Sequence, residues 1–320
     1  MRKTIATLAL TAAWSAASAQ GYPAKAIHLV VGFAPGGASD IIARTMGDPL
    51  SRSLGQSIVV DNKPGAGSSL AAEFVARSSP DGYTILLASQ SGMIVNPLIN
   101  KNVRYNIDRD FVALTQVTSS PLVAAVNPAV PVRSIRELIA EAKKAPGKLN
   151  YASSGNGSLP HLAGVLFSAL AGVEMVHVPY KSGGQSVQSV LAGDTQITFA
   201  TSPSVMPLVQ ANRLRGLAVT TRERSPLVAG LPGMEEAGVA HYDLSVWYGL
   251  FAPAGTPSNV ARRLFDATTL ALENSRLKEV LARDGTQTAG SKSPEAFVVF
   301  LHKDAEAVAR MIRDSGAKFD

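Results

Sequence analysis

Residues 27–40 read IHLVVGFAPGGASD, which joins an apolar run to a glycine-rich turn and the start of a helix. The run Ile27–Val31 is rich in β-branched residues and predicts a buried strand. Apolar residues then recur four apart from Ile42 to Leu54, as on the inner face of a helix. Strand, loop and helix in this order form the repeating unit of parallel α/β proteins.

The same unit recurs along the chain. Short β-branched runs predict further strands at residues 58–60, 83–87, 149–152, 175–178, 195–199 and 214–219, with helical stretches between them. From Pro257 onward the pattern is helical, with a glycine-rich break near residues 285–290. About 300 residues of this kind predict two α/β domains rather than one core.

Two long, nearly uncharged segments have the character of crossings between domains. They are residues 111–126 and residues 242–253, and the second contains Trp247, Tyr248 and Phe251. A chain that leaves one domain, builds the other and returns needs two such strands. Ordinary long strands within one sheet explain the residues equally well, so both alternatives stand at this point.

The first nineteen residues have the order of a secretory signal. Arg2 and Lys3 precede an apolar stretch, and Ala17-Ser18-Ala19 supplies a small-residue cleavage pattern. We therefore expect residues 1–19 to be a signal peptide and the mature protein to be periplasmic. The chain has no cysteine, so we expect neither disulfides nor a lipid anchor.

Composition argues against nucleic-acid binding. Lys and Arg number 30 against 24 Asp and Glu, and loss of Arg2 and Lys3 lowers the formal charge from +6 to +4. The basic residues form no run and are not interleaved with aromatic residues. We expect no nucleic-acid partner.

Four glycine-rich loops each follow an expected strand and open an expected helix. Backbone N–H groups at a helix start, together with the helix dipole, make such a loop an anion site. None of the four has the Gly-Lys-Ser/Thr ending of a phosphate loop or the spaced glycines of a dinucleotide fingerprint. Two loops in each half, facing a cleft, indicate a small carboxylate bound by neutral donors. The loops span residues 33–40, 62–69, 153–161 and 179–184.

Several side chains in or near these loops have two interpretations. Asp40 either contacts a ligand or supports the helix start, and the second role is favoured because an acidic residue there complements the dipole. His161 and Lys181 either contact an anion or pack and face solvent. His177, inside an apolar strand, and Trp247, inside a long strand, are expected to be structural.

Catalytic patterns are missing from the sequence. The five histidines show no metal-ligand spacing, and no Gly-x-Ser-x-Gly turn occurs. We expect no metal, no cofactor and no enzymatic activity. An enzyme acting on a carboxylate remains the alternative, with Asp40 and His161 as its only candidate acid/base groups.

Taken together and in order, these motifs resemble one family. The chain is similar to the Bug family, the periplasmic receptors of tripartite tricarboxylate transporters, over essentially its whole mature length. The matching segments are FAPGGASD (33–40), NKPGAG (62–67), SPDGYT (79–84), YASSGNGS (151–158) with His161-Leu162, VPYK (178–181) and WYGLFAP (247–253).

The resemblance implies a type II periplasmic-binding-protein fold, in which two α/β domains joined by two crossing strands enclose a ligand cleft. It implies one domain from residues 22–120 and 248–320 and another from residues 121–247. It also implies a monomer that binds a small carboxylate and delivers it to the transporter's membrane subunits. A ligand-sensing adaptor for a membrane sensor is a further alternative.

Carried over by position, the resemblance places two walls around the ligand. Phe33, Ala34, Gly37, Ser39 and Asp40 form one wall, and Ser154, Gly155, Asn156, Ser158 and His161 form the other. The predicted ligand-binding set also includes Ala38, Gly67, Ser68, Gln90, Ser91, Lys181 and Ser202. The chain departs from the family pattern at Ser68, Ala71 and Ser182, where glycine is usual, so the resemblance leaves the identity of the carboxylate open.

Overall fold

The structure is a computed structural model that describes residues 21–317 and 319. The predicted signal peptide, residues 1–19, lies outside the described residues. Within the described part of the chain, no helix is both long enough and apolar enough to cross a membrane.

The first sheet is built around three parallel strands. β1 pairs with β2 and with β3, and β9 adds to β3 in the antiparallel sense, followed by β4. These strands are β1 (Ile27–Val31), β2 (Ile58–Asn62), β3 (Thr84–Ser89), β4 (Phe111–Val126), β9 (Ser245–Pro253) and the two-residue β10 (Gln287–Thr288), which pairs with β4.

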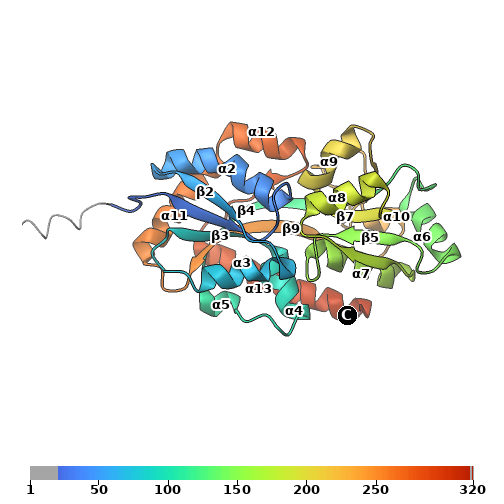
Figure 1. Cartoon of the computed structure of the whole chain (residues 1–320), viewed down its shortest axis with the longest axis horizontal. Helices are drawn as coiled ribbons and strands as arrows, with labels where there is room; N and C mark the ends of the chain where they lie inside the picture. The colour runs from blue at the N-terminus through green and yellow to red at the C-terminus, as the bar shows by residue number, and fades with distance from the viewer. Residues whose placement is uncertain (1–20, 318, 320) are drawn as a thin grey trace, which may run out of the picture.

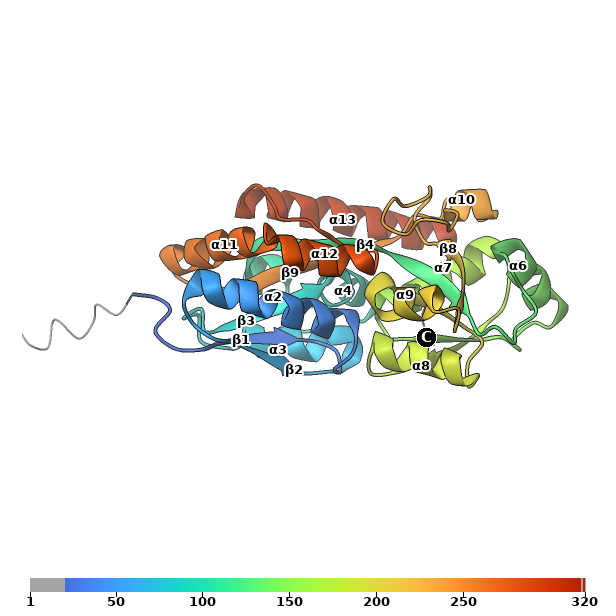
Figure 2. The same cartoon turned by 90° about the horizontal axis from the view of Figure 1, so that it is seen from above.

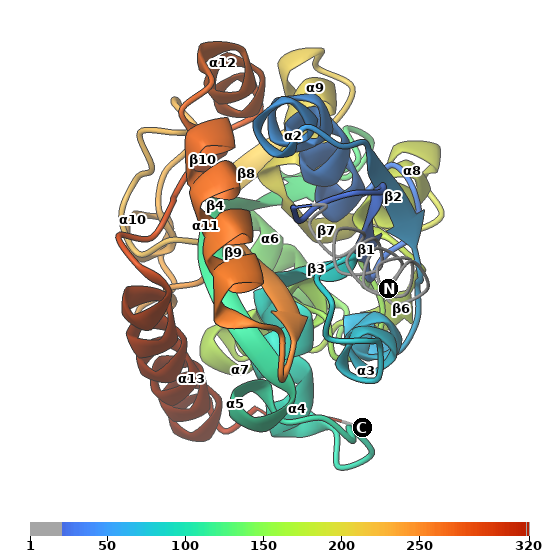
Figure 3. The same ribbon diagram turned by 90° about the vertical axis from the view of Figure 1, so that its left-hand side faces the viewer.

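Helices from both ends of the chain cover this sheet. They are α2 (Ala38–Leu54), α3 (Ser69–Ala76), α11 (Ser258–Leu272), α12 (Ser275–Arg283) and α13 (Pro294–Ser315), with the short turns η2 (Ala66–Ser68), η3 (Ser91–Val95), α4 (Asn96–Ile99) and α5 (Ile107–Asp110). The three C-terminal helices gather on one side of the molecule (Figure 3). The predicted helical C-terminal region is confirmed, and the glycine-rich break contains β10.

The second sheet repeats the α/β pattern with the middle of the chain. β5 lies parallel to β6 and β7, while β4 runs antiparallel to β7 and β8. Its elements are α6 (Ile135–Lys144), β5 (Asn150–Ser153), α7 (Leu159–Ala171), β6 (Val176–Pro179), α8 (Gly183–Ala192), β7 (Ile197–Thr201), α9 (Ser202–Gln210), β8 (Arg215–Val219) and α10 (Met234–Ala237). The two sheets lie end to end along the long axis (Figure 1).

Strand β4 belongs to both sheets. Its residues from Phe111 to Pro121 pair with β9, and its residues from Leu122 to Val126 pair with β7 and β8. The change of partner therefore falls between Pro121, which lies opposite Ser245, and Leu122. The prediction that residues 111–126 cross between domains is confirmed.

The return crossing is shorter. The backbone N–H of Leu244 donates to the carbonyl of Thr220 just beyond β8, at 2.9 Å, and Ser245 then begins β9 in the first sheet. The return segment lies beside β4, so the two crossings form one narrow connection. Helix α13 runs along the same side of the molecule (Figure 2) and packs against both β4 and α7.

Candidate ligand-binding site

A small cavity lies where the two halves meet. Its walls come from the first residues of four helices, from the turn after β3 and from β9. The lining residues are Phe33, Gly37, Ala38, Ser39, Ser91, Ser154, Leu159, Pro160, Gly183, Thr201, Val246 and Tyr248. The volume is about 20 Å³, enough for a water molecule but not for an organic acid. Ligand entry therefore requires the two halves to move apart.

Four helix starts converge on this cavity, one from the first half and three from the second. Their N-cap residues are Gly37 of α2, Ser158 of α7, Ser182 of α8 and Thr201 of α9. The first N–H groups of a helix have no acceptor within the helix, and the aligned peptide dipoles place partial positive charge there. The cavity is thus suited to an anion.

None of the described residues that line the cavity has a charged side chain. Ser39 lines the cavity and is 2% exposed, and its hydroxyl has no hydrogen-bond partner among the described residues. A buried hydroxyl without a partner loses the free energy of a hydrogen bond that a ligand oxygen can restore. The chemistry of the site is therefore that of neutral donors around an anion.

Direct hydrogen bonds join the two halves around the cavity. The N–H of Ala34 donates to the carbonyl of Lys181 at 3.2 Å, and the N–H of Leu159 donates to Oγ of Ser91 at 2.8 Å. Lys181 contributes its backbone here, while its side chain is exposed. The described conformation is therefore closed.

Glycines allow this close approach. A Cβ at Gly184 of α8 would lie 2.7 Å from the carbonyl oxygen of Gly36 in the first half. A Cβ at Gly67 would lie 2.7 Å from the carbonyl oxygen of Asn156 in the second half. Side chains at either position would keep the halves apart.

Asp40 lies next to the cavity, but its carboxylate is hydrogen-bonded to groups of its own domain. Its carboxylate accepts hydrogen bonds from Arg44 Nε at 2.9 Å, Asn62 Nδ2 at 3.0 Å and the N–H of Gly36 at 3.1 Å. Burial raises the pKa of this carboxyl, but the hydrogen bonds outweigh burial and hold the pKa below its ordinary value. Asp40 supports the loop and helix start, as the favoured interpretation predicts.

The structure brings together six residues of the predicted set as cavity lining: Phe33, Gly37, Ala38, Ser39, Ser91 and Ser154. Others support the walls from outside the lining. Ser158 caps α7 by accepting the N–H of His161, and Ser202 Oγ donates to the carbonyl of Pro121 at 2.8 Å. Gly155 has a φ of 113°, a conformation that glycine adopts without strain.

Ser68 and Gln90 are also placed behind the lining. Ser68 Oγ packs where a Cβ at Gly32 or Gly92 would stand. The amide of Gln90 donates to the carboxylate of Asp304 on α13. For these residues, direct ligand contact stays a prediction that the described conformation does not favour.

His161 lies on a different surface. Its ring stacks on His177, with 4.1 Å between ring centroids, and lines a groove of about 870 Å³ with Tyr151, Asn156 and Ala317. The N–H of Gly157 donates to Nδ1 of His161 at 3.3 Å. The imidazole is therefore turned away from the cavity between the helix starts.

Six lining residues are missing from the predicted set: Leu159, Pro160, Gly183, Thr201, Val246 and Tyr248. Four of them belong to the first turn or the N-cap of a helix, and three of these, Leu159, Pro160 and Gly183, lie within the glycine-rich loops that the sequence indicated. Val246 and Tyr248 come from β9, where the side of the strand that faces the cavity depends on register.

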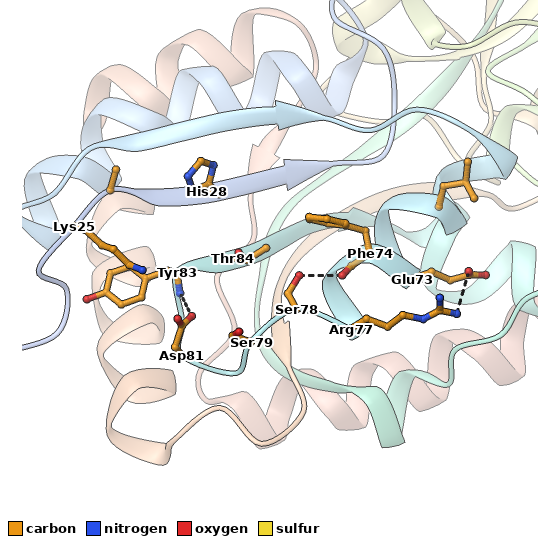
Figure 4. A pocket seen from close by; sticks show the side chains of 12 residues that line it. Lys25, His28, Glu73, Phe74, Arg77, Ser78, Ser79, Asp81, Tyr83 and Thr84 are labelled. Atoms are coloured by element: carbon orange, nitrogen blue, oxygen red, sulfur yellow. Dashed lines mark hydrogen bonds and ion pairs between the residues drawn. The ribbon is translucent and has the colours of Figure 1, made fainter.

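A second hollow lies at the far end of the first sheet (Figure 4). Its volume is about 730 Å³, and its lining includes Lys25, His28, Arg77 and Asp81. All of its walls come from one half of the molecule, so closure cannot enclose a ligand there. Among the described residues, no cluster of three or more His, Asp or Glu side chains could hold a metal ion.

Sequence comparison identifies relatives over nearly the whole chain. The family model described as "Tripartite tricarboxylate transporter family receptor" matches residues 42–316. The UPF0065 protein in the tcbD-tcbE intergenic region of Pseudomonas sp. (strain P51) is 36% identical over 97% of this chain and 93% of that protein. Protein BugT of Bordetella pertussis is 33% identical over 94% of this chain and 92% of that protein.

Solved structures share the fold. Rpa4515 of R. palustris with adipate has a TM-score of 0.88 and 31% identity, covering 92% of this chain and 99% of that chain. MatC from Rhodopseudomonas palustris with bound malate has a TM-score of 0.87 and 25% identity, covering 91% and 100%. Both similarities extend over the two halves and the connection between them.

Proposed function

The chain belongs to the tripartite tricarboxylate transporter receptor family, and from this premise we propose that it captures a small carboxylate between its two domains. Proteins of this family are periplasmic substrate-binding receptors and not enzymes. The similar proteins solved with adipate and malate support a carboxylate as the ligand.

One observation carries the proposal: four helix starts from both halves surround a cavity whose lining, within the described part of the chain, has no charged side chain. An anion held by α2 alone would gain nothing from closure. An anion held by α2 and by α7 to α9 together binds the closed form more tightly, and this differential affinity drives closure.

The remaining assignments follow the family role. We infer that residues 1–19 direct export, that the mature receptor is monomeric, and that its closed form is recognised by the transporter's membrane subunits. Domain bounds of 22–120 with 248–320, and 121–247, are supported by the change of sheet between Pro121 and Leu122. Ser245 to Trp247 pair with β4 in the first sheet, which supports placing the second bound a few residues before 247.

A thermal-shift titration with adipate and malate tests the proposal on protein purified from the periplasm. A ligand that binds only the folded state adds about 2.7 kcal/mol at a hundredfold excess over Kd, so the melting temperature should rise with concentration. The matched variant is Gly37→Leu, which places a bulky side chain in the cavity wall. We expect it to melt like the wild type without ligand and to lose the response.

Other carboxylates extend the screen to tricarboxylates, amino acids and aromatic acids. A response to none of them, from a folded sample free of bound ligand, would contradict the carboxylate assignment. An undiminished response of Gly37→Leu would place the binding site elsewhere.

A further inference from the structure

A carboxylate on α13 lies directly behind the candidate site. Asp304 Oδ1 and Oδ2 accept hydrogen bonds from Nε2 of Gln90 at 2.9 and 2.8 Å. Asp304 Oδ2 also accepts the indole N–H of Trp247 at 2.9 Å. One side chain of the C-terminal helix therefore holds two segments that are far apart in the sequence.

Both donors adjoin residues that line the cavity. Gln90 precedes Ser91, which lines the cavity and accepts the N–H of Leu159 from the other half. Trp247 lies between Val246 and Tyr248, which both line the cavity. Because side chains alternate along a strand, Trp247 points to the opposite face, toward α13.

The carboxylate of Asp304 is held by neutral donors among the described residues. Among the described residues, no cation forms an ion pair with Asp304. Its partner Trp247 packs edge-on against the rings of Phe297 and Phe300, both at 5.9 Å between centroids. Burial raises the pKa of the Asp304 carboxyl, only partly offset by the bonds from Trp247 and Gln90. Replacing this carboxylate by an apolar side chain would leave the N–H groups of Gln90 and Trp247 without their acceptor, and both residues adjoin the cavity lining.

We propose that Asp304 is a positioning residue of the ligand site, which fixes the Gln90–Ser91 and Val246–Tyr248 segments from behind. The inference rests on the proposed function, since it assigns these segments to the carboxylate site. Without Asp304, the Ser91 hydroxyl and the β9 wall lose their fixed position while the fold persists.

The test is hydrogen exchange with mass spectrometry on the ligand-free protein purified from the periplasm. In Asp304→Leu, we expect peptides that cover residues 88–95 and 154–162 to exchange at least about fivefold faster, since loss of the bond to Gln90 alone implies a change of that size. The melting temperature should fall by several degrees, because the N–H groups of Gln90 and Trp247 lose their acceptor. Glu306→Gln changes an exposed carboxylate on the same helix and should leave exchange at wild-type rates.

Two further variants keep the test decisive. If Asp304→Leu does not fold, Gln90→Leu removes the other end of the same bond and should accelerate exchange in the same peptides. Asp304→Asn should restore part of the protection, because its oxygen can accept from Trp247 while its amide donates to Gln90 Oε1, which has no partner among the described residues.

Wild-type exchange in both Asp304→Leu and Gln90→Leu would overturn the inference. Acceleration of similar size over the whole protein would also overturn it, because that result indicates a general structural role. In a parallel binding measurement with adipate, Asp304→Leu should bind about fivefold more weakly than the wild type. Failure of adipate and malate to bind the wild type would count against the proposed function, while the exchange comparison would still decide the role of Asp304.

Discussion

The Oγ of Ser91 accepts the backbone N–H of Leu159 at 2.8 Å, and this bond joins the two halves of the molecule. Ser91 begins the turn after β3, and Leu159 is the first residue of α7. A helix-start donor, of the kind that binds anions, is thus paired with a hydroxyl of the opposite half in the closed form. Opening of the halves must break this bond.

Replacement of Ser91 by alanine should therefore favour opening. Loss of the bond is expected to weaken the closed form by about 1 kcal/mol, or roughly fivefold in the closed-to-open ratio. Small-angle X-ray scattering should record a larger radius of gyration. Ser53→Ala removes a hydroxyl that bonds only within α2, to the carbonyl of Pro49, and serves as the control. Identical scattering from Ser91→Ala and Ser53→Ala would contradict this expectation.

Gly184→Ala should hinder closure of the two halves without lowering the stability of the fold. Alanine favours a helix over glycine, yet its Cβ would lie 2.7 Å from the Gly36 carbonyl only when the halves are closed. We expect an unchanged or higher melting temperature and about tenfold weaker binding of the carboxylate that stabilises the wild type. Gly47→Ala, also in a helix and with no neighbour within 4 Å of its Cβ, should bind normally. Calorimetric titration of both variants checks the contrast, and equal affinities would rule out the steric explanation.

The protein should become less stable as the pH is lowered, because His177 becomes protonated more readily in the unfolded chain than in the folded protein. Burial and, secondarily, the neighbouring His161 lower the pKa of His177 to about 4 in the folded protein. An unfolded histidine titrates near 6.5, so the unfolded chain binds more protons between about pH 6.5 and 4. This contribution, about 1–3 kcal/mol, is present above pH 6.5 and is lost as the pH falls toward 4.

Denaturant unfolding at pH 7.5 and pH 4.5 measures this loss. His177→Gln keeps a polar side chain without the titration, and its stability should depend less on pH. An equal loss in the variant and the wild type would assign the pH dependence to other groups.

Intact-mass measurement of protein from the periplasm tests the expected export signal. We expect a mass that corresponds to the chain beginning at Gln20, with no added lipid, since the sequence has no cysteine to carry one. The mature protein would then contain Trp247 as its only tryptophan, because Trp14 lies in the removed segment. A full-length mass would contradict cleavage after Ala19.

The sequence predicts the architecture well because that information is local. A run of sixteen residues with almost no charge, from Phe111 to Val126, is too long for a typical single-sheet strand and is observed as one strand in two sheets. The glycine-rich loops likewise carry their own signal, since φ values such as 113° at Gly155 require glycine.

The direction in which an individual side chain points could not be predicted in the same way. Val246 and Tyr248 line the cavity whereas Trp247 does not, and only the pairing register of β9 decides this. His161 follows directly after Pro160, which lines the cavity, and the step of about 100° between successive helix residues turns its ring to the other surface. The bond between Gln90 and Asp304 joins residues 214 apart, a distance over which no sequence pattern indicates contact.

The place where β4 changes sheets has a mechanical consequence. Pro121 has no backbone N–H, so the ladder has no donor to satisfy at the residue where the strand leaves β9. On the other side, the N–H of Leu122 is held by Oγ1 of Thr220, within the second sheet. The carbonyl of Pro121 likewise accepts a hydrogen bond from Oγ of Ser202 in the second half. The Pro121–Leu122 peptide is therefore held by the second half through both of its polar groups, so rotation of the halves should flex β4 on the N-terminal side of this peptide.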